Sequence, residues 1–263
     1  MTDYHRSIDL QRLWHTVLAE ARADAQRFPL LADFYRLNLL QHATFAAALA
    51  YVLAAKLADS DAQIVPWHRL FNDLMAAHPE IEAAALKDLS CQLQSNASVK
   101  DHYTPLLHFG GYQALQSYRL AHACWQQGDR PLANYIQGRV VTLYGVDIHP
   151  AAQVGAGIFI DHAVGIVVGE TAVIEDDVTL FQSVTLGGTG KGSGDRHPKV
   201  RQGAFIGSGA LILGNIEIGA GAKVGAGAIV VKSVAPNQTV IGSAAKSISA
   251  APHTNAKTLM QKP

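Results

Sequence analysis

The stretch VRQGAFIGSGALILGNIEIGAGAKVGAGAIVV, residues 200–231, decides the fold, because its aliphatic residues recur at every sixth position. The series is Val200, Ile206, Ile212, Ile218, Val224 and Val230. Neither the 3.6-residue period of a helix nor the two-residue period of an ordinary strand produces this spacing. A period of six is typical of a β-helix, in which three short strands form one triangular coil. Each aliphatic residue then points inward and stacks on the residue three repeats later, so that Ile206 is expected over Val224.

The same period extends toward the N-terminus of the repeat region, in the series Ile148, Val154, Ile160, Ile166, Ala172, Val178 and Val184. The same rule places Ile148 over Ile166. The interval from Val184 to Val200 is far longer than one repeat. Its glycine-rich, charged segment TLGGTGKGSGDRHPK, residues 185–199, cannot fit inside a coil and is expected to loop outward, where long loops usually carry function.

The first half of the chain carries helical patterns instead. LQRLWHTVLAEARADAQRF (residues 10–28) and GYQALQSYRLAHACW (residues 111–125) repeat apolar residues every three or four positions. We therefore predict an α-helical oligomerisation domain over residues 1–140 and a β-helix domain over residues 141–234, with an extruded loop at 185–199. Residues 235–263 are expected to form a C-terminal tail.

Composition excludes several classes of protein. The chain has 263 residues, with 21 basic and 21 acidic side chains, whereas a nucleic-acid binder is expected to carry a basic excess. The longest apolar run, residues 43–55, is short of the roughly 20 residues that a membrane span needs. The charged N-terminus lacks an apolar signal core, which predicts a cytoplasmic protein. Cys91 and Cys124 form neither a disulfide framework nor a metal-ligand cluster.

Titratable residues interrupt the aliphatic background at the start of the repeats. Asp147 and His149 lie in DIHP, and Asp161 and His162 follow about one coil later. A carboxylate near an imidazole can fix its tautomer and stabilise its protonated form, which makes the histidine a general base. From spacing alone, a catalytic pair and a pair that only decorates a corner are equally compatible with the sequence.

Three segments together carry a family resemblance: VDIHPAAQVGAGIFIDHAVGIVVGETAVIEDDV (146–178), QSVTLGGTGKGSGDRHPKV (182–200) and IGSGALILGNIEIGAGAKVGAGAIVV (206–231). They closely resemble the serine O-acetyltransferases of the hexapeptide-repeat acyltransferase superfamily. The resemblance implies a left-handed β-helix. It also implies transfer of acetyl from the co-substrate acetyl-CoA to the hydroxyl of L-serine, the first step of cysteine biosynthesis, without a bound metal or permanent cofactor.

The resemblance also assigns roles to residues at the matching positions. It makes His162 the general base and Asp147 its partner. Asp161 would hold the serine amino group, Arg196 its carboxylate, and His197 would line the same pocket. A planar guanidinium suits a carboxylate, because it can donate two parallel hydrogen bonds. Direct transfer is expected rather than an acyl-enzyme, since both cysteines lie in the helical half.

Acetyl-CoA in this superfamily lies along the β-helix, in a cleft between neighbouring subunits. Gly203, Ala204 and Lys223 are the contacts that the resemblance suggests. The family is typically a trimer or a dimer of trimers, so a monomer would lack a complete site. L-cysteine is the expected feedback inhibitor.

Three departures from the family pattern affect these expectations. One is that Gly242, Ser243, Ala244 and Ala245 replace the usual Gly-x-Pro-Ala after the last coil. The family motif Arg-Asp-Pro-Ala is replaced by Ser95, Asn96, Ala97 and Ser98. Asn96 is still expected to bind substrate, although its amide lacks the charge of an aspartate. The tail ends in KTLMQKP, without the terminal isoleucine of many members. No stable complex with O-acetylserine sulfhydrylase is therefore expected.

Other functions are compatible with a β-helix. The nearest alternative is an acetyltransferase with another acceptor, such as homoserine or a sugar. A γ-type carbonic anhydrase needs three histidines placed to bind zinc, and His149, His162 and His197 lack its paired spacing. A non-catalytic scaffold would leave the charged loop and the Asp–His set unexplained.

Overall fold

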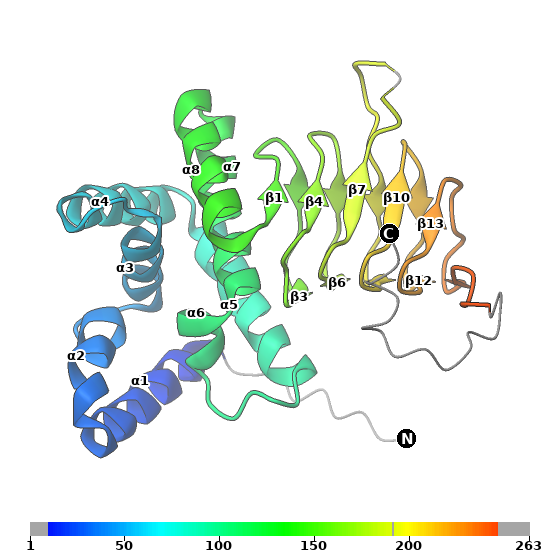
Figure 1. The fold of residues 1–263 in the computed structure, drawn as a ribbon. Helices are drawn as coiled ribbons and strands as arrows, with labels where there is room; N and C mark the ends of the chain where they lie inside the picture. Colours follow the sequence, from blue (N-terminus) through cyan, green and yellow to red (C-terminus); the bar gives the residue numbers. More distant parts are fainter. Residues whose placement is uncertain (1–9, 191, 247–263) are drawn as a thin grey trace, which may run out of the picture.

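The computed structural model describes residues 10–190 and 192–246, and it consists of a helical domain followed by a parallel β-helix (Figure 1). This confirms the predicted fold class. The expectation about the sulfhydrylase complex depends on the last residues of the tail, which lie outside the described residues. Within the described ranges, no helix is both long and apolar enough to span a membrane.

The helical domain packs around buried alanine and leucine side chains. Its elements are α1 (Leu10–Arg27), η1 (Pro29–Leu31), α2 (Ala32–Tyr35), η2 (Arg36–Leu40), α3 (Phe45–Leu57), α4 (Asp61–Ala77), α5 (Pro79–Ser95), α6 (Thr104–His108), α7 (Gly110–Gln126) and α8 (Arg130–Tyr144). The alanine-rich α3 is buried along most of its length. The side chain of Thr44 caps it by accepting a hydrogen bond from the N–H of Ala47.

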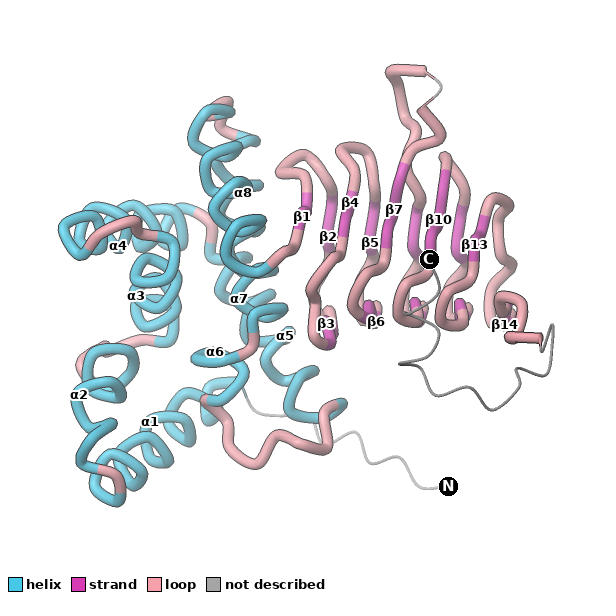
Figure 2. Tube along the Cα trace, in the orientation of Figure 1, coloured by secondary structure: helices cyan, strands magenta, loops and turns pink. Residues whose placement is uncertain are grey.

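The β-helix is built from two- and three-residue strands that form three parallel sheets (Figure 2). Sheet A contains β1 (Asp147–Ile148), β4 (Val167–Val168), β7 (Thr185–Gly187), β10 (Leu211–Leu213) and β13 (Ile229–Val230). Sheet B contains β2 (Gln153–Val154), β5 (Val173–Ile174), β8 (Lys199–Val200) and β11 (Glu217–Ile218). Sheet C contains β3 (Phe159–Asp161), β6 (Thr179–Phe181), β9 (Phe205–Ile206), β12 (Lys223–Val224) and β14 (Thr239–Val240).

The strand register confirms one predicted stacking pair and corrects the other. Ile206 lies over Val224, as predicted. Ile148 lies over Val168, so the prediction that it lies over Ile166 was wrong. The reason is a corner with two extra residues between Ile160 and Val168, which are eight positions apart instead of six.

The two extra residues shift the phase of the next repeats. The strand positions that stack through the first coils are Val168, Ile174, Leu180 and Leu186. The predicted series from Ile166 to Val184 follows the other buried position of each repeat, two residues earlier, whose side chains are also fully buried. An aliphatic count alone does not separate these two classes, because both point into the coil.

Element bounds differ slightly from the expected domain limits. α8 continues to Tyr144, and Gly145, with φ of 63°, ends it in a left-handed conformation that glycine adopts without strain. The loop that leaves the coil occupies residues 188–198, because Thr185 to Gly187 and Lys199 belong to strands. The β-helix also continues past residue 234, since β14 pairs with β12.

Two helices close the N-terminal end of the β-helix. The first coil has an open edge, whose backbone groups need hydrogen-bond partners. Arg119 of α7 donates to the carbonyls of Val154 (3.3 Å) and Gly155 (2.7 Å), and it pairs with the fully buried Asp88 of α5 at 2.7 Å. This buried ion pair fixes the helical domain against the coil, because removal of one partner would leave an uncompensated charge.

Candidate active site

His162 lies in the corner that contains the two extra residues. This corner, residues 161–165, connects β3 of sheet C to β4 of sheet A, and we call it the His162 corner. His162 and Ala163 have φ values of 58° and 69°, a left-handed region that side chains other than glycine rarely adopt. Backbone bonds from Ala163 N–H to Asp161 O (2.7 Å) and from Val164 N–H to His162 O (2.9 Å) hold the turn. The other described non-glycine residues with positive φ, Asp177, Ser183 and Asn237, occur singly, so two in succession distinguish this corner.

The His162 corner faces a pocket of about 290 Å³ between the β-helix and the helical domain. The pocket is lined by Asn96, Ser98, His108, Phe109, Gly110, Gly111, Ile160, Asp161 and His162. The His162 side chain is 74% exposed, whereas that of Asp161 is 24% exposed. His162 Nε2 lies 3.7 Å from Asp161 Oδ2, beyond hydrogen-bond distance. The imidazole is therefore free to exchange a proton with a bound molecule.

Asn96 reaches this pocket from the C-terminal end of α5. Its Oδ1 accepts hydrogen bonds from the N–H of Ser98 (3.0 Å) and from the hydroxyl of Ser98 (2.6 Å). The amide oxygen is thus already used, and the NH₂ group is the part of Asn96 left for a ligand. Asn96, Asp161 and His162 line the same pocket.

Asp147 is placed differently from its expected role. Its Oδ1 accepts a hydrogen bond of 2.6 Å from Nε2 of Gln137 on α8. Within the described part of the chain, no hydrogen bond or ion pair joins Asp147 to His162. Gln137 was not anticipated from the sequence, since nothing in a helical pattern marks a contact with a strand ten residues later.

Arg196 and His197 belong to a second group, which we call the loop cluster: His149, Glu170, Thr171, Arg196 and His197. Arg196 donates to Glu170 Oε2 at 2.7 Å and to the carbonyl of Gly194 at 3.2 Å. The Thr171 hydroxyl oxygen accepts from the backbone N–H groups of Arg196 (3.0 Å) and His197 (3.1 Å). Thr171 therefore anchors the returning end of the extruded loop to the coil.

The His197 ring is the most buried part of the loop cluster. The residue is 7% exposed, and the N–H of Thr171 donates to Nδ1 at 3.2 Å. The neutral ring then carries its proton on Nε2. Burial, followed by the charge of Arg196, lowers the pKa of His197. The ring lies against Gly169, where an added Cβ would overlap it.

His149 completes the loop cluster from the first coil. The N–H of Ala151 donates to His149 Nδ1 at 3.0 Å, and the ring packs edge-on against Trp125 of α7 with centroids 5.1 Å apart. Burial lowers the pKa of His149, while the nearby charge of Glu170 raises it by a smaller amount. Glu170 and Thr171 were not anticipated from the sequence. The two consecutive polar residues in the segment GET, residues 169–171, were a usable signal, because they lie at a corner of the coil.

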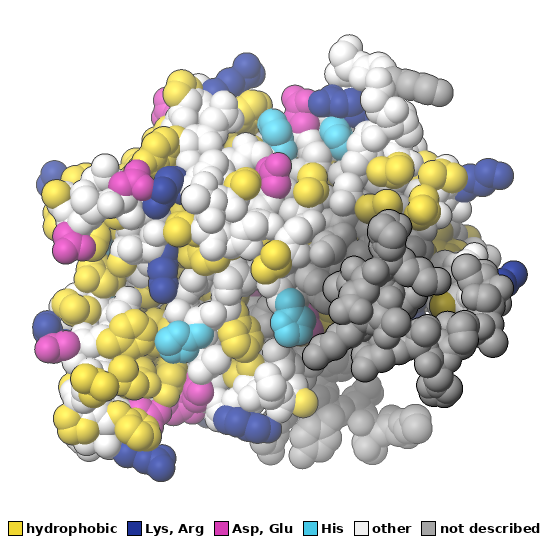
Figure 3. Space-filling view, viewed as in Figure 1, with side chains coloured by type: hydrophobic (Ala, Val, Ile, Leu, Met, Phe, Trp, Pro, Cys, Tyr) yellow, Lys and Arg dark blue, Asp and Glu magenta, His cyan; other side chains and the backbone are white. Residues whose placement is uncertain are grey.

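The two groups lie at opposite ends of the strands of sheet A. The His162 corner lies between β3 and the start of β4, at the lower ends of these strands in Figure 1, whereas the extruded loop follows the end of β7 and rises at their upper ends. Figure 3 shows histidine, acidic and basic side chains close together near the base of that loop. Within one chain, the described residues give no contact between the His162 corner and Arg196 or His197.

The expected acetyl-CoA contacts lie further along the β-helix. Gly203, with φ of 68°, and Ala204 form a corner between β8 and β9. The N–H of Gly203 donates to Asp176 O, and that of Ala204 to Arg201 O, so the coil already uses these two donors. Lys223 is exposed on β12, which belongs to sheet C together with β3.

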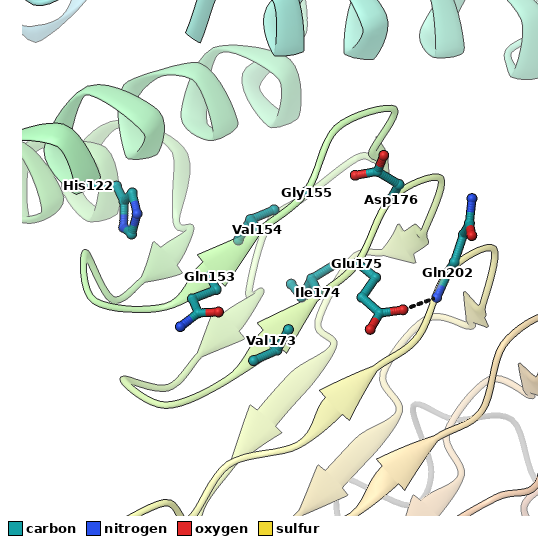
Figure 4. Close-up of a pocket in the computed structure, with 9 residues that line it drawn as sticks. All are labelled: His122, Gln153, Val154, Gly155, Val173, Ile174, Glu175, Asp176 and Gln202. Atoms are coloured by element: carbon teal, nitrogen blue, oxygen red, sulfur yellow. Dashed lines mark hydrogen bonds between the residues drawn. The ribbon is translucent and has the colours of Figure 1, made fainter. Parts of the chain in front are cut away.

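A larger hollow of about 500 Å³ lies on sheet B beside α7 (Figure 4). Its carboxylates are already paired, because Glu175 accepts from Arg201 at 2.8 Å and Asp176 pairs with Lys87 at 3.1 Å. None of the expected site residues lines it. Among the described residues, no group of three or more histidine, cysteine, aspartate or glutamate side chains is arranged to hold a metal ion.

Both halves of the chain match known families. Residues 13–117 match the family described as serine acetyltransferase, N-terminal, and residues 197–232 match the bacterial transferase hexapeptide (six repeats) family. The serine acetyltransferase of Salmonella typhimurium is 50% identical over 238 residues, which is 90% of this chain and 87% of that protein. That of Haemophilus influenzae is 44% identical over 237 residues, covering 90% and 89%.

Solved structures agree with the sequence comparisons. Soybean serine acetyltransferase complexed with serine superposes with a TM-score of 0.87 at 42% identity, covering 91% of this chain and 99% of that chain. Serine acetyltransferase in complex with coenzyme A from Brucella abortus gives a TM-score of 0.86 at 40% identity, covering 92% and 97%. Identity at this level over nearly the whole length shows common ancestry of both domains. This chain belongs to the serine acetyltransferase family.

Proposed function

We propose that the chain is a serine O-acetyltransferase, which transfers acetyl from acetyl-CoA to the hydroxyl of L-serine and so begins cysteine biosynthesis. One observation carries the assignment of the site. His162 Nε2 and Asp161 Oδ2 lie 3.7 Å apart at the mouth of one pocket. Serine carries its hydroxyl and its ammonium on neighbouring carbons, so an imidazole and a carboxylate this close suit both groups at once.

In this proposal, Asp161 binds the serine ammonium and His162 receives the hydroxyl proton. The serine oxygen attacks the thioester carbonyl as Nε2 of His162 removes its proton, and the new C–O bond gives a tetrahedral intermediate. The C–S bond then breaks, and the imidazolium delivers the proton to the departing CoA sulfur. O-acetylserine and free CoA leave, and the imidazole is neutral again.

The two cysteines give no support for a covalent acyl-enzyme. Cys91 is half-buried on α5, and burial raises the pKa of its thiol. Burial also raises the pKa of Cys124, on α7, to about 11. Both thiols are protonated at neutral pH, which makes them poor nucleophiles. Reduced thiols fit our assignment of the protein to the cytoplasm.

We further propose that the loop cluster of one subunit completes the pocket of its neighbour. Arg196 would bind the serine carboxylate, with Glu170 holding the guanidinium in place and His197 beside it. This arrangement explains why the two groups lie at opposite ends of the strands of sheet A in one chain. It requires a homo-oligomer, a trimer or a dimer of trimers. Acetyl-CoA would lie in the cleft between neighbouring copies, near Gly203, Ala204 and Lys223.

Outward apolar residues on sheet A support association through this region. Val167, Leu211 and Ile229 belong to β4, β10 and β13, and Val167 and Ile229 are exposed large hydrophobic side chains. Val164, in the His162 corner, is exposed as well. An apolar surface of this kind, beside a site that one chain leaves incomplete, suits a contact with another copy.

Asp147 remains the proposed orienting carboxylate for His162, with Gln137 holding it in the free enzyme. Catalytic hydrogen bonds often tighten only when substrate is bound. L-cysteine carries the same ammonium and carboxylate as L-serine, so it is the proposed competitive feedback inhibitor of the pocket.

The direct test of this function follows thiol release from acetyl-CoA with L-serine, homoserine and a panel of sugars as acceptors. L-serine should give the highest kcat/KM. The oxygen of Asn96 is occupied by Ser98, which leaves Asp161 as the main partner for an ammonium. A comparison of acceptors with and without an ammonium is therefore informative. A higher kcat/KM with homoserine or a sugar would contradict L-serine as the acceptor. Absence of thiol release with every acceptor would contradict the enzyme assignment.

A further inference from the structure

One face of α5 runs along β3, beside the proposed active-site residues. β3 is the edge strand of sheet C, so its outer backbone groups have no neighbouring strand. Asp88 Oδ1 accepts the N–H of Ile158 at 2.8 Å, just before this strand. One helical turn later, Gln92 Nε2 donates to the carbonyl of Ile160 at 3.2 Å.

Helix and strand stay in step over this contact. Four residues of α-helix rise about 6 Å, and two residues of strand advance about 6.6 Å. One further step of four residues along α5 reaches Asn96, which lines the pocket with Asp161 and His162. The face of α5 therefore follows β3 up to the His162 corner.

We propose that Gln92 is a positioning residue, which holds the Ile160 carbonyl and thereby sets the direction in which β3 enters the His162 corner. The proposal rests on the proposed function, because it assumes that His162 is the base. Ile160 lies two residues before His162, and no other side-chain donor to its carbonyl occurs among the described residues.

The stability of the fold does not explain a glutamine at this position. Gln92 is 1% exposed, and among the described residues its Oε1 has no hydrogen-bond partner. A buried acceptor without a partner lowers the stability of the folded state. An apolar side chain of similar size would remove the unpaired Oε1 but would leave the Ile160 carbonyl without its donor, so the two effects on stability oppose each other. The donor on Nε2 is the feature that distinguishes glutamine here.

The His162 corner has little room to adjust by itself. A Cβ added to Gly111 of α7 would lie 3.0 Å from the Ile160 oxygen and 3.0 Å from the Ala163 Cβ, so the helix already contacts the corner closely. His162 and Ala163 also hold left-handed φ values. Rotation of the Ile160 peptide toward another partner would therefore move the imidazole, and small displacements of catalytic groups are costly in rate.

The test replaces Gln92 with methionine, which keeps the length of the side chain and removes both polar atoms. Gln92→Met should lower kcat about 10-fold, leave the KM for acetyl-CoA unchanged and leave the Tm nearly unchanged. The matched control is Gln113→Met. Gln113 is a buried glutamine of α7 that donates to the Leu106 carbonyl at 2.9 Å, and it should lose stability but not kcat.

A double mutant separates positioning from general damage. If Gln92 acts through His162, then Gln92→Met should cause no further loss of kcat in a His162→Asn background. Independent, multiplicative losses would overturn the inference, as would wild-type kcat in Gln92→Met. A fall in kcat that only follows the loss of folded protein, as measured by the Tm, would also overturn it. High activity in His162→Asn alone would instead contradict the proposed function.

Discussion

Two corners of the β-helix contain insertions into the six-residue repeat, and the two insertions are held in place in different ways. The His162 corner has two extra residues, left-handed backbone angles and a close cover of α5 and α7. The extruded loop, residues 188–198, stands away from the coil, and its returning end is tied back by the hydroxyl of Thr171. The short insertion holds the backbone that carries one imidazole by turn hydrogen bonds and helix packing, and leaves the ring exposed. The long one fixes a guanidinium and a second imidazole by polar contacts.

The difference indicates a division of labour. The base candidate, His162, lies on a rigid corner and keeps an exposed ring that can exchange a proton. The carboxylate-binding candidate, Arg196, lies on the loop and is held by Glu170. A proton transfer needs precise placement, whereas a charged contact tolerates some movement.

The largest effect is expected at the short insertion. His162→Asn should lower kcat by at least about 10²-fold, because the amide cannot accept the hydroxyl proton. The Tm should change little, since the ring makes no hydrogen bond within the described chain. Asp147→Asn should cause a smaller loss. Steady-state kinetics of thiol release measures both variants, and near-normal turnover of His162→Asn would exclude it as the base.

The next effect tests how the loop cluster is packed. Gly169→Ala should lower kcat/KM for serine about 10-fold or more, because the new Cβ displaces the buried His197 ring. Gly188→Ala is the matched control, since its Cβ would lie 3.5 Å from His197 Nε2 in ordinary contact. Equal kinetics for the two variants would show that the position of His197 does not matter.

A more selective effect is expected for the guanidinium. Arg196→Lys should raise the KM for serine about 10-fold and leave that for acetyl-CoA nearly unchanged, because lysine lacks the planar fork. Arg201→Lys is the control, since Arg201 also pairs with two carboxylates, Glu175 and Glu217, but directly follows β8 of sheet B, outside the loop cluster. A parallel rise of both KM values in Arg196→Lys would mean that the loop shapes the whole cleft.

The smallest effect concerns pH. The pKa values of His42, His108, His149 and His197 are lowered by burial, so the unfolded chain binds protons more readily than the folded one. The resulting stability is fully present above the ordinary histidine pKa of about 6.5 and decreases as the pH falls below it. Between pH 7 and pH 5.5, the Tm of His197→Gln should therefore decrease less than the Tm of the wild type, because the variant lacks the contribution of one of these histidines. An unchanged slope would contradict the assignment of a buried neutral ring.

The sequence predicted the long insertion and missed the short one for a physical reason. Glycines and charges mark residues 188–198 as unable to enter the coil, whereas His162 and Ala163 interrupt the count by only two positions. Ile166 then falls on the other inward position, which is buried equally well, so the aliphatic series looked continuous.

Motifs in the sequence indicate the candidate residues, but they do not indicate which helix residues hydrogen-bond to the strands that carry them. His162, Asp161 and Arg196 follow from motifs, while Gln92 and Gln137 lie on helices whose pattern carries no information about strands. Contacts between the two domains depend on how α5, α7 and α8 dock on the first coil. That docking depends on the backbone groups at the open edge rather than on a local sequence period.

The central claim is that the two insertions meet in one site across neighbouring copies, and mixed oligomers test it directly. Differently tagged His162→Asn and Arg196→Ala chains would be co-expressed, and oligomers that contain both would be isolated through the two tags. In a trimer that contains both chains, about one site in three combines an intact corner with an intact loop, and in a randomly assembled dimer of trimers about one in four does. About a quarter to a third of wild-type kcat/KM for serine should therefore return. If corner and loop act within one chain, every site keeps one defect, and the mixed oligomer would be no more active than its parents.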